Sequence, residues 1–248
     1  MLAVPGSIYS ALSEGTNELL CTHRAEPLCK AADALEPYLY ANGIRFVRNT
    51  PDMTAASSIA QANRLGGFDF YLALHSNAAA PENSGSVRGV LVFYYPTSAE
   101  GKRAADLFAA NLKRVYPLPD LVRTVPTTAL GEVRQPKYPA NLLELGYHDN
   151  TADARWIEGN IQAIAANLVL SLTEYFGLPF VTPITPWEGT VQTPGGGPLN
   201  LRAAPGARAE VVTLLPNGAK LTVYGRYQEW YTVGYQGRLG YAYADFIQ

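Results

Sequence analysis

The segment FDFYLALHSN, residues 68–77, constrains the fold more than any other part of the chain. It is an almost unbroken apolar run that closes with His75, Ser76 and Asn77. Such a run is typical of a strand that is buried on both faces, and strands of this kind belong to sheets that are covered by helices on each side. We therefore expect a layered α/β domain built around this segment.

Helical and strand patterns alternate on either side of this run. Amphipathic spacing predicts helices from Glu26 to Leu39 and over residues 55–65, 98–115 and 152–176, and strand patterns fall at residues 44–49, 89–95, 129–133 and 140–146. Strands that alternate with helices indicate an α/β architecture with a mostly parallel sheet sandwiched between helices. In such sheets, functional residues gather at the carboxyl ends of the strands.

The pattern changes after residue 178. Residues 179–188 contain prolines from Pro179 to Pro186 and show no helical or strand period, so we predict a short, semi-rigid linker. Residues 189–248 consist of short strand-like runs separated by turn residues, which indicates a small all-β barrel or sandwich. The predicted organisation is a domain over residues 1–178, the linker, and a second domain with a core of its own.

Composition and charge limit the classes of function. The chain has 248 residues, 48% hydrophobic and 16% charged, which is typical of a folded globular protein. A formal net charge of -2 argues against a surface for polyanions, so we expect no nucleic-acid partner. We also expect no membrane partner, because no run approaches the roughly 20 apolar residues that cross a bilayer. We expect a monomer. No secretion signal is visible at the start of the chain.

The chain has 3 histidines, His23, His75 and His148. His75 closes the buried run, so its ring is expected at a strand end that faces a crevice, although a hydrogen-bonded core histidine is the alternative. His23 and Glu26 lie on one side of the first helix if that helix extends back far enough. Together with His75 they would form a zinc site with one position open for water. The alternative for this pair is a Glu favoured by the helix dipole beside an exposed His.

Other chemistries fit the sequence less well. Cys21 and Cys29 flank His23 and Glu26, but their spacing is not that of a zinc finger and they are too few for a disulfide scaffold. Ser76 directly follows His75, and neighbouring residues on a strand point to opposite faces, so they cannot form a nucleophile and base pair. The sequence contains no Gly-x-Ser-x-Gly turn and no glycine-rich phosphate loop.

Glu144 is the single carboxylate within the apolar strand pattern of residues 140–146. Burying a carboxylate costs several kcal/mol unless it is paired, bound to a metal or tuned for proton transfer. We therefore predict a functional role for Glu144. The alternative is a structural salt bridge to Arg134 or Lys137.

Three segments together resemble the zinc-dependent N-acetylmuramoyl-L-alanine amidases. They are THRAEPLC at residues 22–29, LALHSNAA at residues 72–79 and LLELGYHDN at residues 142–150. The resemblance implies a hydrolase that cleaves the amide bond between N-acetylmuramic acid and L-alanine in peptidoglycan, with Zn²⁺ as its cofactor.

The resemblance also implies roles for individual residues. His75 and Glu26 would bind the zinc ion, and Glu144 would be the catalytic acid/base. Members of the family usually supply a further histidine from a Gly-His-Gly turn after the first strand, and this sequence has no such turn. His23 is the nearest replacement as the third ligand, and His148 is the reserve candidate.

The second domain resembles the bacterial SH3-like domains. The motifs are LNLRAAP at residues 199–205, LPNGAKLTV at residues 215–223 and GRLGYAYADFI at residues 237–247. Such modules in wall enzymes bind peptidoglycan peptides, so the resemblance implies peptidoglycan as the partner and action outside the cell or at the cell wall. The candidates for a binding groove are Trp230, Tyr231, Tyr235, Tyr241 and Tyr243, of which about half must serve the core of so small a domain.

Two further functions fit the sequence. A zinc peptidase or deacetylase that acts on another amide would use the same site chemistry. A catalytically inactive wall-binding protein is the other alternative, which the missing Gly-His-Gly turn favours. The zinc content of the purified protein distinguishes an inactive protein from either enzyme.

Overall fold

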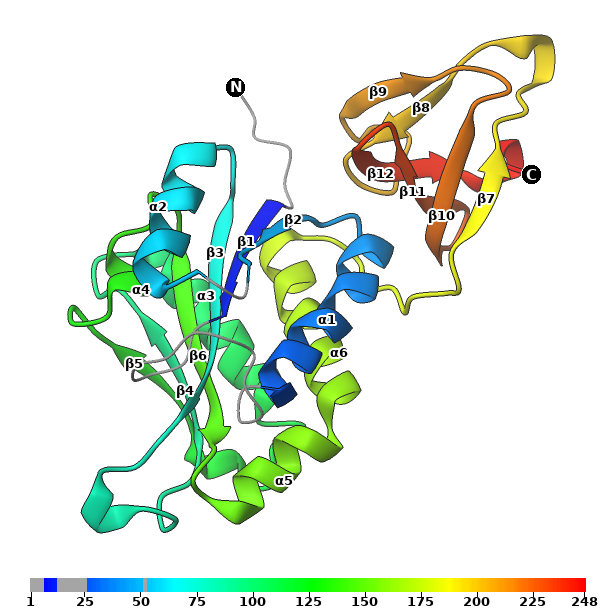
Figure 1. Ribbon diagram of the computed structural model, residues 1–248. Helices are drawn as coiled ribbons and strands as arrows, with labels where there is room; N and C mark the ends of the chain where they lie inside the picture. The colour runs from blue at the N-terminus through cyan, green and yellow to red at the C-terminus, as the bar shows by residue number, and fades with distance from the viewer. Residues whose placement is uncertain (1–6, 13–25, 51–52) are drawn as a thin grey trace.

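The computed structural model describes residues 7–12, 26–50 and 53–248, with side chains from Lys30 onward (Figure 1). An α/β domain comes first and an all-β domain follows, which confirms the predicted fold class. His23 and Cys21 therefore lie outside the described residues. Glu26 and Cys29 are described by their backbone alone.

The sheet of the first domain is mostly parallel. Its strands are β1 (Ser7–Leu12), β2 (Arg45–Arg48), β3 (Phe70–Asn77), β4 (Val90–Tyr94), β5 (Val122–Pro126) and β6 (Ala140–Tyr147). They lie in the order β2-β1-β3-β6-β4-β5, and every neighbouring pair is parallel except β4 and β6. The strands that carry His75 and Glu144, β3 and β6, are thus neighbours in the middle of the sheet.

Helices cover both faces of this sheet (Figure 1). They are α1 (Glu26–Ala41), α2 (Ala55–Leu65), α3 (Ala99–Leu112), α4 (Gly131–Arg134), α5 (Thr151–Gly159) and α6 (Ile161–Phe176). The helices α1, α3 and α6 pack on one face, and α2 and α4 pack on the other. Among the described residues, none of these helices combines the length and the apolar character needed to cross a membrane.

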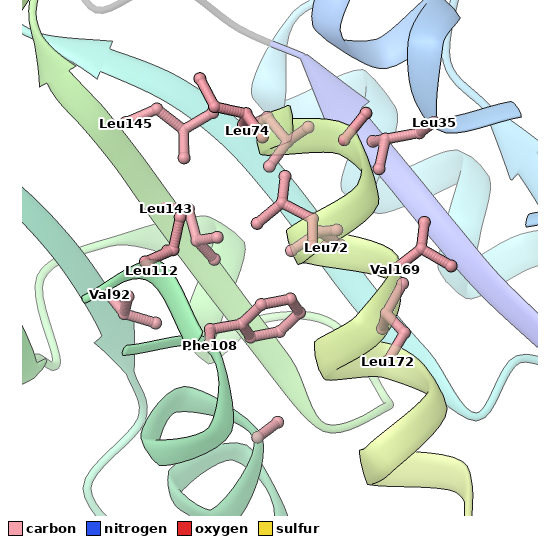
Figure 2. Packing of buried hydrophobic residues seen from close by; sticks show 14 of the residues in the cluster. Leu35, Leu72, Leu74, Val92, Phe108, Leu112, Leu143, Leu145, Val169 and Leu172 are labelled. Atoms are coloured by element: carbon pink, nitrogen blue, oxygen red, sulfur yellow. The ribbon is translucent and has the colours of Figure 1, made fainter. Parts of the chain in front are cut away.

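Successive side chains of β3 point to opposite faces of the sheet, and this explains the apolar run from which the fold was predicted. Leu72 and Leu74 point to the larger core, where they pack with Leu143 of β6 and Phe108 of α3 (Figure 2). Tyr71, like the other residues of alternate parity, points to the smaller core beneath α2 and α4. Both faces are therefore buried, and each fully buried Leu or Phe contributes about 1.5–3 kcal/mol relative to an exposed one.

The predicted strand at residues 129–133 is wrong. The chain forms the single helical turn α4 there, and Val133 packs against Ile59 and Ala62 of α2. A short apolar run fits one face of a helical turn as well as it fits a strand, so periodicity could not decide between them. The strand of this region is β5, at Val122–Pro126, which the sequence patterns did not predict.

The predicted helix over residues 152–176 is two helices. Asn160, with φ of -129°, ends α5 and begins α6, and its side-chain amide donates to the carbonyl oxygen of Trp156 at 2.8 Å. Gly159 and Asn160 both have low helix propensity, which explains a break at this point inside an otherwise helical pattern.

The second domain is an antiparallel sheet of short strands. They are β7 (Trp187–Thr190), β8 (Leu199–Arg202), β9 (Val211–Leu215), β10 (Lys220–Tyr227), β11 (Trp230–Tyr235) and β12 (Arg238–Tyr243). Their order is β7-β10-β11-β12-β8-β9, with antiparallel pairing throughout. The first strand, β7, begins inside the segment that we predicted as a linker.

The second domain packs against the C-terminal end of α1. Tyr241 is fully buried in the larger core of the first domain, and its hydroxyl donates to the carbonyl oxygen of Asn42 at 2.8 Å. Thr232 Oγ1 donates to the carbonyl oxygen of Ala41, also at 2.8 Å. The contact is so close that a Cβ on Gly43, whose φ is +68°, would lie 2.8 Å from the ring of Tyr241. Tyr241 is therefore a core residue and is not available to line a binding groove.

Candidate active site

His75 of β3 and Glu144 of β6 are partners in the parallel register of the two strands. Side chains at matched positions of neighbouring parallel strands point to the same face of the sheet. This is the face covered by α2 and α4, because His75 has the same parity as Tyr71. Both residues lie close to the carboxyl ends of their strands, where the sequence predicted the site.

A third titratable group, Glu132 of α4, lies against His75. The distance from His75 Nε2 to Glu132 Oε2 is 2.9 Å, and the side chains are only 7% and 6% exposed. The hydroxyl of Tyr71 donates to the other oxygen, Oε1, at 3.4 Å. The single helical turn that replaces the predicted strand is what holds this carboxylate over β3.

Glu132 is not among the site residues predicted from the sequence. The signal that it offers is the one that identified Glu144, a lone carboxylate within an apolar run, here ALGEV at residues 129–133. A carboxylate in such a setting needs a partner or a function. Because the run was interpreted as a short strand, nothing in the sequence connected Glu132 with His75.

Two polar atoms of this site are buried without a hydrogen-bond partner among the described residues, His75 Nε2 and Glu144 Oε2. Glu132 Oε2 lies near His75 Nε2 as an ion-pair partner and does not form an aligned hydrogen bond with it. A buried donor or acceptor without a partner costs about 1–3 kcal/mol, so such atoms are rare and call for a partner beyond the described residues.

The structural alternative for Glu144 is not seen. In the described part of the chain, neither Arg134 nor Lys137 forms an ion pair with Glu144. Burial raises the pKa of Glu144; His75 opposes that shift and Glu132 adds to it, and the net pKa is raised. A carboxyl group with a raised pKa exchanges protons closer to neutral pH, as a general acid/base must.

The electrostatics of His75 follow from the same neighbours. Burial lowers the pKa of its imidazole, because a charged ring is poorly solvated in the interior. The carboxylates of Glu132 and Glu144 favour the charged form, and their effect is larger, so the net pKa is raised. The pocket thus attracts positive charge to the position of His75.

Glu26 is the first residue of α1, and its side chain lies outside the described part. Because α1 connects the parallel strands β1 and β2, it begins at the carboxyl edge of the sheet, and Figure 1 shows its start toward the end at which β6 terminates. This is the edge that carries His75 and Glu144. The role predicted for Glu26 remains a prediction, as does that of His23.

His148 follows β6 and is exposed. Its Nδ1 lies 3.1 Å from Ser76 Oγ and 3.2 Å from the carbonyl oxygen of Ser76. Ser76 points to the opposite face of β3 from His75, so no described contact brings His148 to the site. Among the described side chains, no three His, Cys, Asp or Glu residues are grouped closely enough to hold a metal ion.

The loop that follows β3 is fixed to the segment after β6 by Asp153, which is fully buried. Its carboxylate accepts hydrogen bonds from Arg88 Nε at 2.8 Å and from the Tyr116 hydroxyl at 2.6 Å. The backbone N–H groups of Gly89 and Tyr147 donate to it at 3.0 and 3.1 Å. This network joins the end of β6 to the start of β4, so it holds the far end of the loop against the sheet.

Asp149 anchors the same loop closer to its tip. It accepts hydrogen bonds from the backbone N–H of Gly85 at 3.1 Å and of Ala79 at 3.3 Å. Burial raises the pKa of Asp149, but these backbone donors outweigh it and the net pKa is lowered. Asp149 is therefore a structural carboxylate, in contrast to Glu144.

Fold and site define a two-domain protein whose α/β domain carries an imidazole and two carboxylates at the carboxyl edge of its sheet. The model of the N-acetylmuramoyl-L-alanine amidase family matches residues 25–174. The chain therefore belongs to this family of hydrolases, as the sequence motifs predicted. The model of the bacterial SH3 domain matches residues 197–248.

Solved structures show the same fold for the first domain. An N-acetylmuramoyl-L-alanine amidase from Clostridium difficile 630 is 16% identical, with a TM-score of 0.57 over 70% of this chain and 98% of that chain. The amidase Ami1 from Mycobacterium smegmatis is 15% identical, with a TM-score of 0.57 over 71% and 99%. The catalytic domain of the CD27L endolysin, which targets Clostridia difficile, is 19% identical, with a TM-score of 0.56 over 68% and 97%. The comparison with curated proteins found no match.

Proposed function

We propose that this protein hydrolyses the amide bond between N-acetylmuramic acid and the L-alanine of the peptidoglycan stem, with Glu144 as the general acid/base. The family supplies the substrate class. The observation that supports the role of Glu144 is its buried Oε2, which has no partner among the described residues and lies beside His75 at the carboxyl edge of the sheet.

The residues present fit the zinc ion that the family implies. His75 Nε2 is buried and unpaired within the described structure, and two carboxylates lie next to it, which is the nitrogen and oxygen donor chemistry that zinc takes. His75 would hold the ion together with Glu26 and, as the sequence suggests, His23, with His148 in reserve. A zinc ion bound there would polarise the scissile carbonyl and lower the pKa of a bound water.

Glu144 carries the proton through the reaction. Its carboxylate accepts a proton from the attacking water, whose oxygen bonds to the carbonyl carbon of the lactyl group. The C–N bond then breaks, and Glu144 returns the proton to the amine of L-alanine as it leaves. The raised pKa of Glu144 suits both transfers. No covalent intermediate with the enzyme is required.

For the all-β domain we infer peptidoglycan binding, and action at the cell wall or outside the cell. A surface groove of ≈ 470 Å³ runs along β7, β10 and β11, where it is lined by Glu188, Lys220, Thr222, Tyr235 and Gln236. Lys220 and Glu188 pair with each other at 2.7 Å, and this ion pair, next to the Tyr235 ring, suits a short peptide that carries both charges. Tyr235 is thus the aromatic candidate that the groove supports.

An inactive wall-binding protein is the second candidate, which the missing Gly-His-Gly turn favours. Purified sacculi separate the two functions. An active amidase releases stem peptides with a free L-alanine N-terminus, and the purified protein carries about one zinc per chain. Full zinc occupancy with peptide release that Glu144→Gln abolishes would establish the proposed function. Absence of zinc, with no release after zinc is added, would establish the inactive protein.

A further inference from the structure

We propose that Glu132 is a direct ligand of the metal ion held by His75. The inference rests on the zinc-dependent function proposed above and goes beyond it, because it assigns a donor that the sequence motifs do not contain. Glu132 would take the ligand position for which the sequence, which has no Gly-His-Gly turn, offers His23.

Glu132 and His75 place two potential metal-binding atoms next to each other. Oε2 of Glu132 and Nε2 of His75 are 2.9 Å apart, yet Nε2 has no hydrogen-bond partner in the described structure. A carboxylate that only orients a metal-bound histidine accepts a hydrogen bond from the other N–H of the ring. Here the carboxylate lies close to the ring nitrogen without that bond, which favours a shared cation.

The charges of the pocket support the same assignment. Glu132 and His75 are both buried, and Glu144 lies beside His75 in the register of β3 and β6. Among the described residues, no lysine or arginine forms an ion pair with either carboxylate. Within the described part of the chain the ion-pair partner of Glu132 is His75 itself, and a divalent cation held between the two would compensate the charge of the buried carboxylate.

The surroundings of Glu132 hold it in place. The hydroxyl of Tyr71 donates to Oε1 and leaves Oε2 for the metal. Val133, the next residue, anchors the α4 turn in the smaller core against Ile59. Glu132 and His75 supply two donors, and the sequence offers Glu26, the first residue of α1, as a further one.

The test measures the affinity of the full chain for Zn²⁺ by competition with a chromophoric chelator. Glu132→Gln keeps the shape of the side chain and removes its charge. Loss of an outer-shell partner typically weakens metal binding about 10- to 100-fold, so we expect a weakening of more than about 100-fold for a ligand. Glu158→Gln, an exposed change on α5, is the matched control and should bind Zn²⁺ as the wild type does.

The outcomes separate this inference from the function on which it rests. If His75→Ala loses Zn²⁺ while Glu132→Gln weakens it by less than about 100-fold, Glu132 is not a ligand and the zinc site remains. A wild-type protein that binds no Zn²⁺ overturns both proposals. Should Glu132→Gln not fold, Glu132→Asp keeps the charge and withdraws the carboxylate by one methylene. A weakening of Zn²⁺ binding by more than about 100-fold in Glu132→Asp supports the ligand role, and a smaller loss overturns it.

Discussion

His75 of β3 and Glu144 of β6 are matched in the parallel register, so both side chains leave the sheet on the same face near its carboxyl edge. The rigid pairing of two central strands sets their separation. Binding and proton transfer are therefore assigned to side chains on a fixed scaffold, which is how precise catalytic geometry is maintained.

Glu144→Gln should separate proton transfer from metal binding. The amide keeps the shape of the side chain but cannot accept the proton, so turnover on peptidoglycan should fall roughly 10²- to 10⁴-fold. Zinc content and melting temperature should stay at wild-type values. Near-wild-type cleavage by a variant with normal zinc and stability would show that Glu144 is not the general acid/base.

His75→Ala should abolish zinc binding and activity together, because it removes a buried donor of the site. Metal analysis of the purified variant measures this. His148→Ala is the matched control, since the ring of His148 contacts Ser76 and no described contact joins it to His75. Loss of zinc in the control would mean that His148 is a ligand.

His23→Ala tests the third ligand predicted from the sequence. If Glu132 completes the site, zinc affinity should stay within a few-fold of the wild type, whereas an imidazole ligand would cost more than about 100-fold. Chelator competition on this variant and on Glu132→Gln, measured side by side, identifies which of the two residues binds the ion.

Asp153→Ala should destabilise the first domain. The change leaves Arg88 and Tyr116 without their shared carboxylate, and removing one partner of a buried charged network costs about 3–5 kcal/mol. Tyr116→Phe removes a single hydrogen bond and should cost about 0.5–1.5 kcal/mol in the free energy of unfolding. Urea denaturation of both variants checks the order, and equal losses would contradict the network.

Deletion of residues 181–248 should leave a folded amidase domain that binds sacculi more weakly. The fragment should also be less stable, because it loses the pairing of the Asn42 side chain with the backbone of Val181 and the buried contacts of Tyr241. Tyr241→Phe in the full chain isolates one of these hydrogen bonds, worth about 1 kcal/mol. Sacculus pelleting and thermal melts test the two effects separately, and undiminished wall binding by the fragment would contradict the role of the second domain.

Local patterns in the sequence were sufficient for the elements whose burial shows in their composition. The apolar runs of β3 and β6 predicted strands buried on both faces, and the histidine that closes the first run and the carboxylate within the second made His75 and Glu144 the candidates. Burial on both faces indicates helices packed above and below the sheet, as α1, α3 and α6 on one face and α2 and α4 on the other provide.

The sequence by itself thus determined the α/β class and the all-β module, and it singled out His75 and Glu144, which the structure places side by side. Tertiary structure alone decided that α4 is a helical turn, that Glu132 lies 2.9 Å from His75, and that Tyr241 is buried in the core of the other domain. Each of these depends on contacts between segments far apart in the chain. Short runs such as ALGEV carry too little periodicity to choose a conformation, so packing against α2 and β3 makes the choice.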